Sequence, residues 1–201
     1  MEFAYKIDKG EIKMKITITP ITESKRILDK CRLTVNKEPS KNPRPSTVFL
    51  DNIYMSEHSP IREKVFDIYI EDIPYCISTH YVRHHVGCEK FVTTSRSDRT
   101  DVKDRSQRSQ MDLVNMSMTI NAQSLINLAK VRLCYCADKD ARKVMFEIVR
   151  QIKEIEPELG NKLVPNCIYR GFCSENNKES GYSKEFLRNW RKEYLNGRET
   201  F

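Results

Sequence analysis

The sequence predicts a single α+β domain, on three observations. A chain of 201 residues can bury one good hydrophobic core. Residues 14–19 alternate isoleucine with polar residues, and residues 64–71 are aromatic and β-branched, so both segments are predicted strands. Farther along, residues 112–155 carry apolar side chains at helical spacing. We expect one domain over 1–201, ending in a helical tail at 182–201.

The first half alternates predicted strands and helices. The strand at 14–19 is closed by Pro20, and a helix follows in 24–35, where apolar residues fall roughly on one face. Residues 36–46 hold three prolines and several charges, which is typical of a connection. After the strand at 64–71, a helix over 73–86 would place His80, Arg83 and His84 on one face.

The second half is predicted to be helical after a polar loop at 95–110. A long helix is expected from Asp112 or Asn115 to Leu133, and a second one over 138–155 that would form an antiparallel hairpin with it. In the tail, 183–195 spaces its aromatic residues four apart, which indicates a helix that docks on the body or on another subunit.

Composition excludes several classes of protein. No segment approaches the run of about 20 apolar residues that spans a bilayer, and the N-terminus lacks a signal-peptide pattern. We therefore expect a cytoplasmic protein without a membrane partner. A formal net charge of +7 favours an anionic partner, but acidic residues interrupt the basic tail and make nucleic acid an unlikely one. Only six glycines and no Gly-rich loop argue against Rossmann and Walker sites.

The residues best suited to chemistry lie between Glu57 and Arg96. All four histidines fall there, with Arg83, in an otherwise apolar strand and helix. Burying cations without compensation costs several kcal/mol each, so a bound anion is a natural partner. The alternative is structural pairing of the arginines with Glu57, Glu63 or Glu89, and these residues alone do not decide between the two.

Three ordered blocks of this chain resemble the flavin-dependent thymidylate synthases. The family signature is Arg-His-Arg, seven or eight residues, then Ser and a nearby Arg; here residues 83–96 read RHHVGCEKFVTTSR. Upstream, residues 57–60 (EHSP) resemble its histidine-containing entry, and downstream, residues 121–134 (NAQSLINLAKVRLC) resemble its Asn-Ala-Arg-Ser-Leu helix. Departures are His85 for Arg, Thr94 for Ser and Gln123 for Arg. The shortened middle segment resembles members from bacteriophages and prophages.

The resemblance implies an antiparallel sheet packed with long helices, and an enzyme that binds FAD and dUMP. It assigns FAD binding to one set of residues: Arg83, His84, His85, Asn121, Gln123 and Asn127. It assigns dUMP binding to a second set: His80, Thr94, Ser95, Arg96 and Arg132. Arg132 would also be catalytic, because a cation near the uracil carbonyls stabilises negative charge that develops on the ring. The family's sites are shared within a homotetramer.

Helical geometry supports one part of this assignment independently. At 100° per residue, Asn121 and Arg132 would lie within about 40° of each other and about 16 Å apart along the axis of one helix. That spacing suits an extended ligand, such as a flavin with a nucleotide stacked on it. Gln123 and Asn127 would point elsewhere and reach a ligand only across a subunit interface.

The resemblance implies conversion of dUMP to dTMP, with methylenetetrahydrofolate as carbon donor and NADPH as reductant. His85 and the shortened middle keep two alternatives open. One is FAD-dependent modification of another pyrimidine nucleotide, and the other is a non-catalytic relative that binds nucleotides or nucleic acid. Among the seven cysteines, those at 134, 136, 167 and 173 could hold zinc, but their spacing is not the usual one, and buried thiols without metal are the preferred interpretation.

Overall fold

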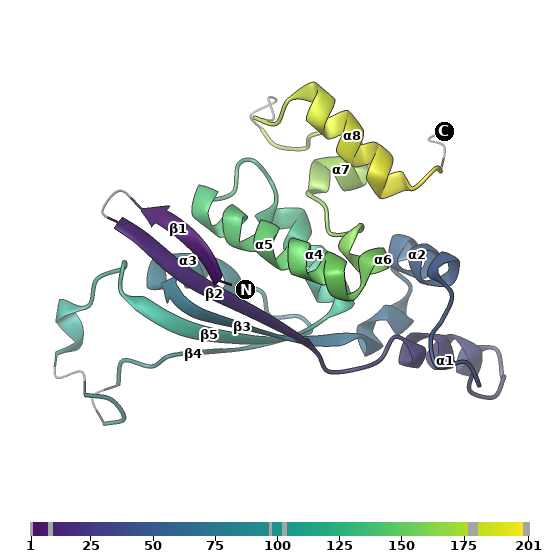
Figure 1. The fold of residues 1–201 in the computed structure, drawn as a ribbon, viewed down its shortest axis with the longest axis horizontal. Coiled ribbons are helices and arrows are strands. Elements are labelled where there is room, and N and C mark those ends of the chain that lie inside the picture. The colour runs from purple at the N-terminus through teal and green to yellow at the C-terminus, as the bar shows by residue number, and fades with distance from the viewer. Residues whose placement is uncertain (1, 8–9, 97, 102–103, 177–180, 199–201) are drawn as a thin grey trace.

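The computed structural model describes residues 2–7, 10–96, 98–101, 104–176 and 181–198. Its centre is a five-stranded sheet in the order β1-β2-β3-β5-β4, in which every neighbouring pair is antiparallel. The strands are β1 (Glu2–Ile7), β2 (Gly10–Pro20), β3 (Val65–Pro74), β4 (Cys88–Val92) and β5 (Leu113–Asn121). The antiparallel sheet packed with long helices is thus confirmed (Figure 1).

Helices cover one face of this sheet and extend beyond its end (Figure 1). Those preceding β5 are α1 (Lys25–Thr34), α2 (Thr47–Ser56), the 3-10 turn η1 (Ser59–Glu63), α3 (Tyr75–Val82) and the 3-10 turn η2 (Arg105–Gln107). Those following it are α4 (Ala122–Arg132), α5 (Lys139–Ile155), α6 (Pro157–Gly160), α7 (Asn166–Arg170) and α8 (Lys184–Leu195).

The core lies between α3, α4, α5 and the sheet face that they cover. On β5, Val114, Met116, Met118 and Ile120 are buried, while the residues between them are exposed or half-buried. This alternation follows from the two-residue period of a strand, which sends successive side chains to opposite faces. The uncovered face therefore presents polar and aromatic side chains, and Phe91 of β4 is 69% exposed on it.

The prediction of a long helix starting at Asp112 or Asn115 is wrong for the first half of that segment. Residues 113–121 form β5 and the helix begins only at Ala122. The reason is visible in LVNMSMTIN, whose apolar residues recur every second position, whereas the helical spacing holds only from Ala122 onward. The next helix, expected at 138–155, is confirmed as α5, with the Asp138 carboxylate accepting from two backbone amides at its N-terminus.

The helix expected over 73–86 is also too long. Helix α3 ends at Val82, and residues 83–87 form a turn that leads into β4, a strand that the sequence analysis missed. Gly87 has a φ of +65°, a conformation that glycine adopts without strain, and it reverses the chain at this point. Arg83 and His84 therefore lie beyond the helix rather than on its face. Strand β1 and helix α2 were not predicted either.

The tail helix docks on the body as expected. Trp190 of α8 stacks on Phe146 of α5, with ring centroids 6.0 Å apart, and Tyr194 is buried in a small second cluster with Val164 and Ile168. Lys162 anchors the same region, because its ammonium donates to the Tyr194 carbonyl and pairs with Asp51 at 2.6 Å. Within the described residues, no helix combines the length and apolar character needed to cross a bilayer.

Candidate active site

The turn after α3 is held against the N-terminus of α4. The Asn121 amide donates to the Gly87 carbonyl at 3.1 Å, and the Ser124 hydroxyl donates to the Val86 carbonyl at 2.5 Å. A Cβ at position 87 would overlap the side chains of Asn121 and Ser124. These contacts place the Arg83-His84-His85 segment beside the β5–α4 junction, although the two segments are far apart in sequence.

Cationic side chains gather around this turn. The Lys90 ammonium donates to the carbonyls of His84 and Cys88, the latter at 2.8 Å, so it bridges the turn and β4. Burial, which has the largest effect, and the positive charges of Arg132, Lys90 and His85 together lower the pKa of His84 to about 4. The imidazole is therefore neutral near pH 7. We call Arg83, His84, His85, Lys90 and Arg132 the cationic cluster.

Arg132 occupies the last turn of α4, next to Tyr81 and Arg83. Burial lowers the pKa of its guanidinium and Arg83 adds to this effect, while the phenol of Tyr81 and the carboxylate of Asp138 oppose it. Burial in turn raises the pKa of the Tyr81 hydroxyl well above its ordinary value, and this hydroxyl donates to the Ala141 carbonyl at 2.5 Å. The arginine thus lies against a neutral phenol, and no carboxylate in the described part of the chain forms an ion pair with it.

Two nitrogen atoms of the cluster lack hydrogen-bond partners. Among the described residues, buried His84 Nε2 and Arg132 Nε are the only side-chain nitrogen or oxygen atoms in this state. An unsatisfied buried polar atom costs about 1–3 kcal/mol. The Arg132 Nε–H can be satisfied only by an acceptor, since guanidinium has no acceptor of its own. A ligand that carries anionic or carbonyl oxygens meets this need and compensates the clustered positive charge.

Asn121 and Arg132 do not lie along one helical wall as expected. Asn121 precedes the helix in an extended conformation and caps it, because its side-chain oxygen accepts from the Ser124 amide at 2.9 Å. The expected relation assumed that both residues had helical angles, which Asn121 does not. The structure instead places Asn121 against Gly87, so it adjoins the cationic cluster through the turn.

Gln123 and Asn127, the other two α4 side chains predicted to bind FAD, lie in different surroundings. Gln123 donates to the Glu57 carboxylate at 2.5 Å, and Lys130 pairs with the same carboxylate at 2.6 Å. Asn127 is exposed. Glu57 therefore links the loop after α2 to α4, with left-handed backbone angles (φ +52°), a role that sequence analysis did not identify.

The residues predicted to bind a nucleotide downstream lie in the loop between β4 and β5. Arg96 forms a two-pronged pair with Asp98 at 2.9 Å, and its backbone amide donates to the Thr94 hydroxyl at 3.2 Å. Ser95 borders a cavity of about 290 Å³ together with Tyr75 and Arg108. The structure thus brings His84 and Arg132 together, whereas Arg96 makes its ion pairs within the loop.

Some site residues were missed by sequence analysis. Lys90 joins the cationic cluster because β4 alternates its side chains, which turns Lys90 to the covered face of the sheet between Cys88 and Val92. The two-residue alternation in CEKFV, residues 88–92, is the sequence signal that could have identified the strand and the side to which Lys90 points. His80, which was predicted, lies half-buried near the end of α3.

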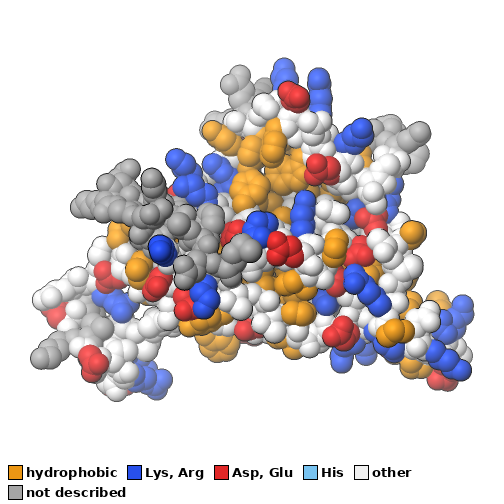
Figure 2. All heavy atoms as spheres, in the orientation of Figure 1, with side chains coloured by type: hydrophobic (Ala, Val, Ile, Leu, Met, Phe, Trp, Pro, Cys, Tyr) orange, Lys and Arg blue, Asp and Glu red, His pale blue; other side chains and the backbone are white. Residues whose placement is uncertain are grey.

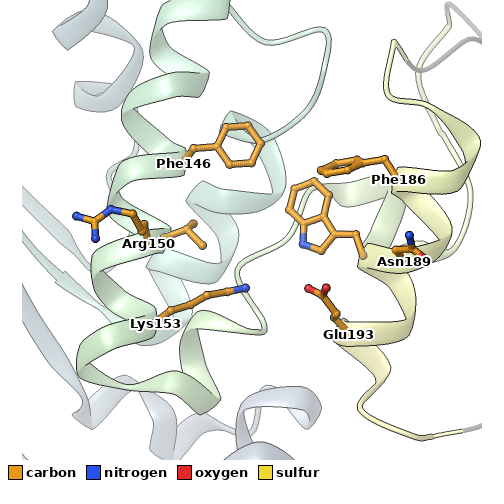
Figure 3. Close-up of a pocket in the computed structure, with 8 residues that line it drawn as sticks. Phe146, Arg150, Lys153, Phe186, Asn189 and Glu193 are labelled. Atoms are coloured by element: carbon orange, nitrogen blue, oxygen red, sulfur yellow. The ribbon is translucent and has the colours of Figure 1, made fainter. Parts of the chain in front are cut away.

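A larger hollow lies elsewhere, between α5 and α8. It has a volume of about 510 Å³ and is bordered by Phe146, Phe186 and Trp190. Lys153 and Glu193 point toward each other across it (Figure 3). In the space-filling view, hydrophobic side chains gather where the tail meets the body (Figure 2). This groove follows from the docking of α8 and includes no predicted site residue.

The fold of this chain also occurs in a solved protein structure. It is shared with the crystal structure of a UMP/dUMP methylase, PolB, from Streptomyces cacaoi bound with 5-Br dUMP. The TM-score is 0.55, and the likeness covers 74% of this chain and 94% of that one at 10% sequence identity. At such low identity the comparison concerns the fold alone.

Sequence comparison finds one matching family model and similar proteins over parts of the chain. The model described as thymidylate synthase complementing protein (Thy1) matches residues 113–158, which span β5, α4 and α5. The flavin-dependent thymidylate synthase of Saccharolobus solfataricus is 27% identical over 84 residues, and that of Sulfurisphaera tokodaii is 33% identical over 54. The alignments cover 42% and 27% of this chain. They span only 32% and 21% of those two relatives. The chain is a relative of the flavin-dependent thymidylate synthases.

Proposed function

We propose that the protein converts dUMP to dTMP with a bound flavin, FAD. In the overall reaction, methylenetetrahydrofolate provides the carbon, NADPH the hydride and solvent one proton, giving dTMP, tetrahydrofolate and NADP⁺. The observation that carries this proposal is the pair of partnerless nitrogen atoms, His84 Nε2 and Arg132 Nε, inside a cationic cluster. Arg132 belongs to the segment that matches the family model.

The cationic cluster fits a flavin dinucleotide, whose pyrophosphate needs positive charge and hydrogen-bond donors. The chain has no Gly-rich loop for this purpose, so side chains must provide both. Arg83, His84 and His85 would hold FAD, with Asn121 at the base of the turn and Gln123 and Asn127 farther along α4. When bound, the flavin supplies the two-electron chemistry, and the protein provides position and electrostatics.

The nucleotide would lie against Arg132. A guanidinium can bond two oxygen atoms at once, and the vacant Arg132 Nε–H is one such donor. Placed at the uracil carbonyls, it would stabilise negative charge that develops on the ring as C5 attacks the carbon donor. His80 of α3 and the loop residues Thr94, Ser95 and Arg96 would hold the deoxyribose phosphate. This requires Arg96 to exchange its exposed Asp98 partner for phosphate.

Activity provides the direct test. We expect tritium release from [5-³H]dUMP when methylenetetrahydrofolate and NADPH are present, and flavin absorbance in the purified protein. The Arg132→Ala variant should lose release by at least about 100-fold, the scale seen when one donor to a developing oxyanion is removed. It should still bind flavin. The exposed Arg62→Ala variant is the matched control and should release tritium at the wild-type rate.

Three outcomes separate the alternatives. Protein that stays colourless after reconstitution with FAD contradicts any flavin reaction. Flavin binding without tritium release, but with modification of another pyrimidine nucleotide, would favour the first alternative, an FAD-dependent enzyme that acts on a different pyrimidine. Binding of dUMP with no turnover of any nucleotide would indicate a non-catalytic relative.

We further propose that the site is shared within a homotetramer. In one chain, Asn127 and Arg96 are both exposed, and Arg96 pairs with Asp98 of its own loop rather than with the cationic cluster. Both side chains can therefore be reached by a neighbouring subunit. Mixing inactive Arg132→Ala chains with inactive Arg96→Ala chains tests this. Shared sites would restore part of the activity, whereas sites built from single chains would remain inactive. Light scattering would give the mass of the assembly.

A further inference from the structure

Four cysteines that are distant in sequence meet at one small cavity. Cys134 and Cys136 lie in the connection from α4 to α5, Cys167 lies in α7, and Cys173 follows shortly after it. All four border the same cavity of about 10 Å³, together with Glu175. About 10–15 Å³ accommodates one water-sized occupant. The two pairs come from segments about 30 residues apart, so only tertiary folding brings them together.

Electrostatic interactions connect the cysteines within each pair. Burial, the Glu175 carboxylate and the Cys136 thiol together raise the pKa of the Cys134 thiol to about 11, and a hydrogen bond with the Cys136 backbone opposes the rise. The Cys134 thiol donates to the Glu175 carboxylate at 3.7 Å. Burial likewise raises the pKa of Cys167, with Cys173 adding to the rise.

The cavity lies where the second hydrophobic cluster joins the body. That cluster has only three buried apolar residues, Val164, Ile168 and Tyr194. Next to the thiols, Tyr182 donates to the Leu133 carbonyl at 2.8 Å, which also links the tail to the end of α4. A cluster this small gains much from an added cross-link, and structural metals commonly provide one.

We propose that Cys134, Cys136, Cys167 and Cys173 bind one Zn²⁺ ion, which ties the α4–α5 connection to the α7 segment. Thiolates are soft ligands that favour zinc, and four of them complete the tetrahedral shell of a structural site. In the described part of the chain, no three His, Cys, Asp or Glu side chains are already grouped around a metal position. Binding therefore requires the thiols to turn inward between staggered χ1 rotamers. Each bound thiol releases its proton to solvent.

Metal content tests the proposal on the full chain. Protein purified without chelator should contain one zinc per chain by mass spectrometry of the metal, and Co²⁺ exchanged into it should show thiolate-to-cobalt charge-transfer absorbance. Cys134→Ser and Cys167→Ser, one from each pair, should each lose most of the zinc. Cys31→Ser and Cys76→Ser are matched controls, because these half-buried thiols in α1 and α3 lie outside the cavity. They should retain it.

Alkylation gives a second readout that needs no variant. With zinc present, the four cavity thiols should react with iodoacetamide at least ten times more slowly than after chelation, while Cys31 and Cys76 should react at unchanged rates. Absence of zinc and of the cobalt band, equal alkylation with and without chelator, or disulfides joining these cysteines would each overturn the proposal.

Discussion

Gly87 and Asn121 are in direct contact where the turn after α3 meets the start of α4. The Asn121 amide donates to the Gly87 carbonyl at 3.1 Å, and the Asn121 side chain occupies the space that a Cβ at position 87 would need. Asn121 at the same time caps α4. One residue pair thus positions both the Arg83-His84-His85 turn and the helix that carries Arg132.

Replacing Gly87 by alanine should destabilise the fold and disturb the site. The left-handed conformation costs alanine about 1 kcal/mol, and displacing Asn121 should bring the total to about 2–4 kcal/mol. Gly197→Ala is the control, because its φ is also positive (+81°) but no atom of the described residues lies within 4 Å of the added Cβ. Urea denaturation would measure both variants. Equal losses would show that the contact with Asn121 contributes nothing.

His84 should titrate far below an ordinary histidine. Its folded pKa is about 4 against 6.5, so between these values the unfolded chain binds more protons than the folded one. The free energy of unfolding should therefore fall as pH drops from about 6.5 to about 4. In the Arg132→Ala variant the His84 pKa should rise, since a neighbouring positive charge is gone. Imidazole NMR titration checks this, and an unchanged pKa would contradict the proximity of the two residues.

Removing the Glu57 carboxylate should loosen α4. Glu57→Ala leaves Lys130 and Gln123 without their shared partner. The ion pair is largely buried, because the Lys130 side chain is 15% exposed and the Glu57 side chain 18%. We expect the free energy of unfolding to fall by about 1–3 kcal/mol. A double-mutant cycle with Lys130→Met would show whether the pair is coupled, and strict additivity would contradict it.

The buried pair between Lys162 and Asp51 should be essential for docking of the tail. The Lys162 side chain is 1% exposed, and Lys162→Ala removes the ammonium group that pairs with the Asp51 carboxylate, leaving Arg198 and Asn196 beside it. We expect the free energy of unfolding to fall by about 3–5 kcal/mol, as for other buried ion pairs that lose one partner. Arg26→Ala breaks a pair with Glu63 in which the arginine is 57% exposed, and it should cost less than about 1 kcal/mol. Thermal unfolding would compare the two.

Where sequence prediction succeeded, a single local period was sufficient. Helix α5 keeps a continuous apolar stripe and an Asp138 cap, and both were evident in the sequence. Prediction was wrong at 113–121, where the apolar residues of β5 run directly into those of α4 without a proline or glycine between them. The local signs of the boundary are the end of the two-residue period of β5 and Asn121, whose side chain caps the helix.

The candidate site was predicted in part for the same reason. The ordered blocks around Arg83, Asn121 and Arg132 are visible along the chain, and the Thy1 match covers the last two. Lys90 and Glu57 were missed, since their roles depend on contacts with residues that are distant in sequence or lie across the turn.

The sequence by itself determined the fold class, the helices at α1, α5 and α8 and the family resemblance, because each depends on residues close together in the chain. Tertiary structure alone decided which distant side chains meet: His84 with Arg132, Glu57 with Lys130, and Cys134 with Cys167. Such meetings depend on how the sheet and helices pack, and packing is set by the whole core rather than by any local period.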